Sequence, residues 1–124
     1  MCPNTERATA AVEPAATLEL AQRIAGTTPL WAQTVALLET AEGFTLAAGG
    51  ATDLSPAQRA TAENLGLTPA NPMPNFHAEL TLINSAGLMR LTPTKGVATN
   101  LVCPSCAGVI EELGGWVAGR YFGF

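Results

Sequence analysis

The chain has 124 residues, enough for one domain with a single core but not for two. Hydrophobic residues make up 48% of it and charged residues 13%, which excludes an intrinsically disordered chain. The net charge is −4 and only 6 residues are Lys or Arg, which argues against a broad basic surface for binding phosphates. A polynucleotide would have to be held by a few base contacts and a flipped base.

The first half of the chain predicts a lead-in, two helices and a β-hairpin. Residues 1–14 are rich in Ala, Thr and Pro without periodicity, so we expect a flexible lead-in before a domain at 15–124. Apolar positions at helical spacing predict a helix over 17–25 that ends at Gly26. Residues 31–38 and 43–48 predict two strands joined as a hairpin. Ser55 and Pro56 are typical of a helix start, and this helix should run to Leu65 before Gly66.

The second half alternates between loops, helices and strands. The predicted elements are a proline-rich loop at 68–75, a helix at 76–86, a loop at 90–96, a strand at 97–102, a helix at 103–113 and a strand at 116–124. The positions expected to face the core are Phe76, Leu80 and Ile83 in the first of these helices and Cys106, Ile110 and Leu113 in the second. Helices between strands indicate an α/β fold, in which we expect the two crossovers to make neighbouring strands parallel.

Four residues in two short motifs have a specific chemical meaning. His77 is the only histidine, and Glu79 follows it two positions later. Two of the three cysteines, Cys103 and Cys106, form a C-x-x-C with metal-ligand spacing. Both motifs fall where a helix is predicted to begin, and free N–H groups at a helix start stabilise thiolates. On an ideal α-helix the side chains of His77 and Glu79 would point about 200° apart around the helix axis. Both can therefore face one pocket only if His77 precedes the regular helix.

One His and two Cys give three protein ligands, which is the pattern of a catalytic zinc site with a fourth position for water. Glu79 would then be the residue that moves the water proton.

These residue types also have uses other than a catalytic zinc site. A lone C-x-x-C is more often redox-active or half of a structural zinc site. Cys2 as a fourth ligand would make a closed structural zinc in a binding module, and a thioredoxin-like site would leave His77 and Glu79 unexplained.

H-x-E followed by C-x-x-C is the signature of zinc nucleobase deaminases. Over residues 31–124 the chain resembles the cytidine deaminase-like superfamily, and within it the deaminase domains of bacterial polymorphic toxins. The approach N-P-M-P-N-F-H-A-E and the short C-terminal end support this resemblance. Val102 stands where relatives usually have a proline before the first cysteine, and the proline here is Pro104.

The resemblance implies a three-layer α/β/α fold with a central mixed sheet and both metal-bearing helices on one face. It implies Zn²⁺ held by His77, Cys103 and Cys106, with Glu79 as the proton shuttle. The implied activity is hydrolysis of cytosine to uracil in single- or double-stranded DNA, by a toxin domain. A free cytidine or nucleotide deaminase and an RNA adenosine deaminase are the alternatives.

Residues that contact the substrate are expected close to these motifs. Phe76 would stack on the base, and Ala48 would form part of the pocket floor. The other expected contacts are Thr52, Asn75, Ser105 and Tyr121. The expected partners are DNA as substrate and an immunity protein, with the chain acting as a monomer. No apolar run approaches the roughly 20 residues that span a bilayer, and we expect no membrane partner. No signal peptide is recognised, and a toxin domain would be secreted within a larger protein and act in the target-cell cytoplasm.

Overall fold

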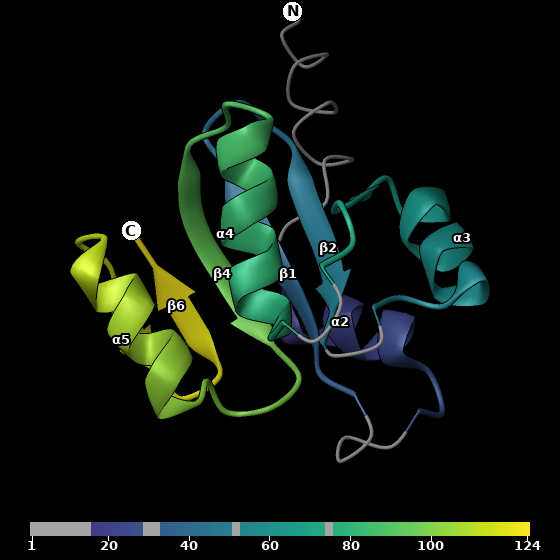
Figure 1. The fold of residues 1–124 in the computed structure, drawn as a ribbon. Coiled ribbons are helices and arrows are strands. Elements are labelled where there is room, and N and C mark those ends of the chain that lie inside the picture. The colour runs from purple at the N-terminus through teal and green to yellow at the C-terminus, as the bar shows by residue number, and fades with distance from the viewer. Residues whose placement is uncertain (1–15, 29–32, 51–52, 74–75) are drawn as a thin grey trace, which may run out of the picture.

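The computed structural model describes residues 16–28, 33–50, 53–73 and 76–124, so the expected lead-in at 1–14 lies outside the described residues. Within this part of the chain, four helices flank a six-stranded sheet of order β3-β2-β1-β4-β6-β5 (Figure 1). The helices are α2 (Leu18–Ala25), α3 (Pro56–Asn64), α4 (Ala78–Leu88) and α5 (Pro104–Glu112). The strands are β1 (Val35–Thr40), β2 (Thr45–Gly49), β3 (Thr68–Pro69), β4 (Pro93–Ala98), β5 (Trp116–Ala118) and β6 (Tyr121–Gly123).

The sheet is mixed, but its neighbouring strands are mostly antiparallel. Only β2 and β3 pair in parallel, whereas β1 pairs antiparallel with both β2 and β4, and β6 pairs antiparallel with both β4 and β5. The prediction that the crossovers make neighbouring strands parallel was therefore wrong. The crossover through α4 does join two strands of the same direction, β3 and β4, but β2 and β1 lie between them in the sheet. A helical crossover fixes the direction of the strand that follows it, but it does not fix which strand lies next to that strand in the sheet.

The side chains of β1 alternate between two cores, one on each face of the sheet. Val35 and Leu37 belong to a core that includes residues of α2 and α3. Ala36 and Leu38 belong to a core that includes residues of α4 and α5. Figure 1 shows α4 and α5 together in front of the sheet and α2 behind it. The expected α/β class is confirmed, with helices on both faces of a central mixed sheet.

The first two described helices begin and end at the residues that the sequence indicated. Thr17 is the N-cap of α2 and accepts a hydrogen bond from the backbone of Leu20, and Gly26 ends the helix with φ of 59°. Ser55 caps α3 through a capping box with Gln58, in which each side chain accepts from the other residue's backbone N–H. These signals are local, which is why they could be recognised without the fold.

Helix α4 differs from the prediction in its ends and its buried face. It begins after the N-cap residue His77 and continues through Gly87. Phe76 precedes the helix and is 44% exposed, and Leu80 and Ile83 are only half-buried. The buried positions are Ala78, Glu79, Thr81, Leu82, Ser85 and Ala86. Mostly small side chains form this face because α4 packs directly on β1 and β2, whereas the prediction followed the larger apolar residues.

The C-terminal strands differ from the prediction in their bounds and their number, and residues 99–102 of the strand expected at 97–102 are not in a strand. Strand β4 begins at Pro93, inside the expected loop, and a proline is tolerated at the first residue of a strand. Residues 116–124 form a hairpin of β5 and β6 rather than one strand, because Gly119 turns the chain with φ of 64°. Leu113 is the C-cap of α5 and is 57% exposed rather than buried. The expected loop at 68–75 includes β3.

Gly96 is needed where β4 passes beneath an aromatic ring. A Cβ atom at this position would collide with the ring of Phe122 and lie 2.6 Å from the carbonyl oxygen of Leu37. We expect Gly96→Ala to lower the free energy of unfolding by about 1–3 kcal/mol, measured by urea denaturation. Gly87→Ala is the control, since a Cβ there meets nothing within 4 Å. That control should be neutral or stabilising by up to about 1 kcal/mol, and equal losses in both variants would contradict the steric argument.

The predicted β1–β2 hairpin is confirmed, although residues 31 and 32 of its expected first strand lie outside the described residues. Its turn is joined to the chain before β4 by Glu42. The Glu42 carboxylate accepts hydrogen bonds from the backbone N–H of Thr92 at 2.8 Å and from its hydroxyl at 2.9 Å. The backbone bond is the larger cause that lowers the pKa of Glu42 below its ordinary value of 4.5.

This contact predicts a pH dependence of stability. Because the pKa of Glu42 is lower in the folded state, its stabilising effect is present above about pH 4.5 and is lost as the pH falls through the folded-state pKa. We expect Glu42→Gln to destabilise the protein slightly at pH 7 and to have less effect at pH 3, measured by urea midpoints. Glu63→Gln, at an exposed position of α3, is the control. A Glu42→Gln difference that does not vary with pH would refute the linkage.

Candidate metal centre

The two motifs meet at the N-terminal ends of α4 and α5. His77 is the N-cap of α4, with extended backbone angles φ −68° and ψ 149°. Cys103 is the N-cap of α5, with φ −74° and ψ 159°, and Pro104 follows at the first helical position. The His77 side chain makes no capping hydrogen bond to α4. The extended backbone at His77 removes the 200° separation from Glu79 that a regular helix would impose.

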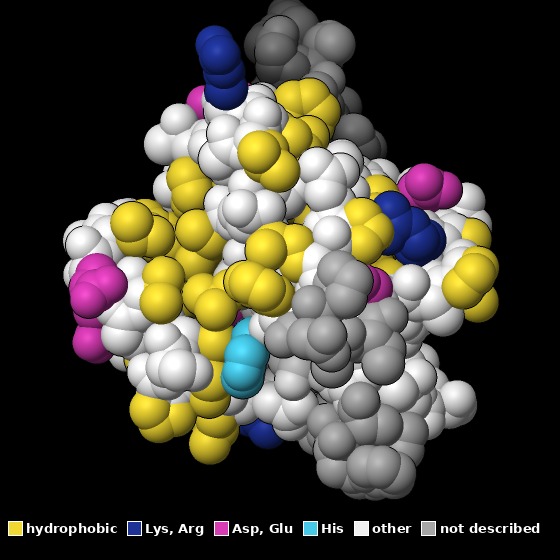
Figure 2. Space-filling view, viewed as in Figure 1, with side chains coloured by type: hydrophobic (Ala, Val, Ile, Leu, Met, Phe, Trp, Pro, Cys, Tyr) yellow, Lys and Arg dark blue, Asp and Glu magenta, His cyan; other side chains and the backbone are white. Residues whose placement is uncertain are grey.

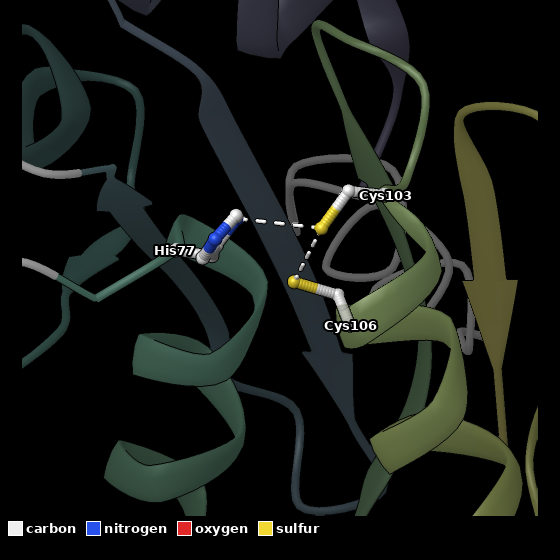
Figure 3. A group of neighbouring side chains, drawn as sticks. All are labelled: His77, Cys103 and Cys106. Carbon is white, nitrogen blue, oxygen red and sulfur yellow. Dashed lines mark hydrogen bonds between the residues drawn. The ribbon is translucent and has the colours of Figure 1, made fainter.

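The ligand atoms of His77, Cys103 and Cys106 all lie within 4.8 Å of one another. Cys103 Sγ lies 3.5 Å from His77 Nδ1 and 3.4 Å from Cys106 Sγ (Figure 3). Ligands of a tetrahedral zinc ion, with bonds of about 2.3 Å to sulfur and about 2.0 Å to nitrogen, are separated by about 3.5–3.8 Å. The three donor atoms are thus close enough to hold one metal ion, and the two separations from Cys103 Sγ are near those expected for Zn²⁺.

Burial decreases steadily across the cluster. Cys106 is 0% exposed, Cys103 is half-buried and His77 is exposed. Figure 2 shows the His77 side chain at the surface, among hydrophobic side chains. Cys106 is thus enclosed by the protein, whereas the imidazole of His77 is accessible to solvent and to a ligand.

The two thiols differ electrostatically. Burial is the main cause that raises the pKa of Cys106 far above its ordinary value, and the neighbouring Cys103 and Glu79 raise it further. Burial also acts to raise the pKa of Cys103, but hydrogen bonds from Ser105 and from the backbone of Cys106 outweigh it and lower the pKa overall. Cys103 is therefore the thiol that ionises first, and a bound cation would be required to ionise Cys106 near neutral pH.

Glu79 lies beside the cluster without being one of its ligands. Its side chain is 3% exposed, at the second position of α4. Burial is the largest cause that raises its pKa, while a hydrogen bond with its own backbone and the charge of His77 lower it. Glu79 interacts electrostatically with His77 and Cys106, in agreement with its place in the first turn of α4, two residues after His77. A carboxyl group held this way can accept and return a proton.

The other expected site residues are only partly brought together. Phe76 is exposed next to His77, and Ser105 Oγ lies 3.2 Å from Cys103 Sγ. Ala48 is 3% exposed and packs in the core beneath α4. Tyr121 precedes Phe122, which points into that same core, so strand alternation turns Tyr121 to the opposite face of the sheet. Thr52 and Asn75 lie outside the described residues, as does Cys2.

Asn100 and Thr34 form a polar pair near the cluster that was not expected from the sequence. Asn100 Nδ2 donates a hydrogen bond to Thr34 Oγ1 at 2.8 Å, which joins the segment before Cys103 to the start of β1. The carbonyl of Thr34 accepts from the N–H of Gly50 at 2.8 Å, and a Cβ on Gly50 would lie 3.5 Å from the N atom of Ala78. Asn100 could have been expected near the cluster, because it lies three residues before Cys103, but nothing in the sequence indicated Thr34.

Comparison with protein-family models, with curated proteins and with solved structures finds no match to this chain. In the part of the chain that the structure describes, no helix is both long and apolar enough to cross a bilayer. The cluster itself and the motifs that form it are therefore the features that bear on function.

Proposed function

We propose that this protein is a zinc-dependent nucleobase deaminase with a cytidine deaminase-like fold. The observation that carries the proposal is the combination of three ligand atoms within 4.8 Å of one another and a buried carboxyl group beside them. A structural zinc site has no need of a carboxyl group that is not a ligand, whereas hydrolytic deamination requires one to move protons. The exposure of His77 supports a centre that a substrate can reach.

The roles of the residues follow from their positions. His77 Nδ1, Cys103 Sγ and Cys106 Sγ would hold the ion, and bound zinc would supply a water molecule acidic enough to act as a nucleophile near neutral pH. The Glu79 carboxylate accepts the proton of that water and delivers it to the ring nitrogen of the base. A second proton transfer through Glu79 allows the exocyclic amine to leave as ammonia. The balance is cytosine plus water giving uracil plus ammonia.

For the substrate we propose cytosine in DNA, in line with the motif resemblance. Phe76 is 44% exposed beside His77 and offers a surface for stacking on an unpaired base. With a net charge of −4, base contacts rather than phosphate contacts would dominate binding. The same resemblance supports a toxin domain that acts as a monomer in the target-cell cytoplasm and is inhibited by an immunity protein.

The proposal is tested by incubating the zinc-loaded protein with single-stranded DNA, double-stranded DNA, RNA, free cytidine and free cytidine nucleotide. Uracil and inosine are then measured by sequencing and mass spectrometry. We expect uracil in at least one DNA substrate. Inosine in RNA, or turnover only of the free nucleoside or nucleotide, would assign the substrate to one of the alternatives. Zinc binding without deamination of any substrate would indicate a structural zinc module instead.

A further inference from the structure

Ser105 lies between the two cysteines in the sequence and has no role in the proposed reaction. It is the second residue of α5, after the N-cap Cys103 and Pro104 at the first position. Its side chain is exposed, yet its hydroxyl oxygen lies 3.2 Å from Cys103 Sγ, closer than either His77 Nδ1 or Cys106 Sγ. The Ser105 hydroxyl therefore points to the sulfur of Cys103, one of the proposed metal ligands.

The direction of this hydrogen bond is determined by the state of the sulfur. A thiol could donate or accept, but a thiolate that binds a metal carries no proton and can only accept. The Ser105 hydroxyl must then be the donor. Such a donor restricts the rotation of the Cys103 side chain and withdraws electron density from its sulfur. Groups that contact metal ligands in this way typically change metal affinity by about 10- to 100-fold.

We propose that Ser105 is a positioning residue that holds Cys103 in its metal-binding orientation and sets the affinity of the His77–Cys103–Cys106 centre for zinc. This inference rests on the ligand set of the proposed function but not on the reaction. It also replaces the role in substrate contact that the sequence suggested for Ser105, because the hydroxyl is directed to Cys103.

Two substitutions at one position separate the hydrogen bond from other effects. Ser105→Ala removes the hydroxyl, and Ser105→Thr keeps it while adding a methyl group at an exposed site. Zinc affinity is measured by competition with a chromogenic chelator, without any substrate. The sulfur-to-metal charge-transfer band is measured after substitution with Co²⁺. Gly108→Ala is the control for changes in α5, since a Cβ there meets nothing within 4 Å.

We expect Ser105→Ala to weaken zinc binding by about 10-fold and to shift the cobalt band to longer wavelength, because the sulfur becomes more electron-rich. Ser105→Thr and Gly108→Ala should both resemble the wild type. Unchanged affinity and an unshifted band in Ser105→Ala would overturn the inference, as would a loss in Ser105→Thr as large as that in Ser105→Ala. A chain that binds zinc as expected but deaminates nothing refutes the proposed function alone.

Discussion

E79Q is expected to lower kcat for deamination by about 10²- to 10⁴-fold, the range contributed by a positioned proton-transfer group. The amide has nearly the size of the carboxyl group but cannot accept the proton of the attacking water. Because Glu79 is 3% exposed and is not a ligand, an amide of equal size should leave the fold and the zinc content unchanged. The loss should therefore appear in kcat with the metal still bound at one equivalent.

The control for this prediction is Glu112→Gln, which makes the same chemical change at an exposed position of α5. It should retain wild-type turnover. Activity is followed by release of ammonia or uracil, metal content by atomic emission and folding by thermal denaturation. If E79Q loses its zinc, Glu79 is a ligand and the three-ligand centre is wrong. If E79Q retains full turnover, another group moves the proton.

Cys106→Ser is expected to weaken zinc binding by on the order of 10²-fold. Structural zinc sites with four protein ligands bind zinc with free energies of roughly 10–16 kcal/mol, which is about 3 kcal/mol for each ligand. Cys106 is 0% exposed and anchors the ligand set in the core. Zinc at 1,000 times its Kd should raise the free energy of unfolding of the wild type by about 4 kcal/mol. The variant, at the same zinc concentration, should gain much less.

Cys2→Ser is the matched control, because it makes the same substitution at the remaining cysteine. With three protein ligands, its zinc affinity should equal that of the wild type. An equal loss in Cys2→Ser and Cys106→Ser would establish a closed four-ligand zinc site, the alternative that the odd cysteine leaves open. In the wild type, zinc binding should also weaken as the pH falls, because protons compete with the metal for the imidazole and the thiolates.

Part of the candidate site could be recognised in the sequence because its signals are short-range. The H-A-E and C-P-S-C motifs contain the ligand types, and the nearby prolines place both motifs at helix starts. The structure brings His77, Cys103 and Cys106 together at these N-caps. The surroundings of these three residues were less predictable. Asn100 and Thr34 are 66 positions apart in the sequence, and Tyr121 is turned to the other face of the sheet by its register in β6.

Several features of this protein could be recognised from the sequence: the caps of α2 and α3, the β1–β2 hairpin, the α/β class and the residues of the candidate metal centre. Each depends on interactions within a few residues, on the order of the predicted elements, or on short motifs that have few uses. Three features became evident only in the folded chain: β4 pairs antiparallel with β1, α4 buries its small residues, and His77 lies beside Cys103. These features depend on which surfaces meet after the chain has folded, and local periodicity carries no information about that choice.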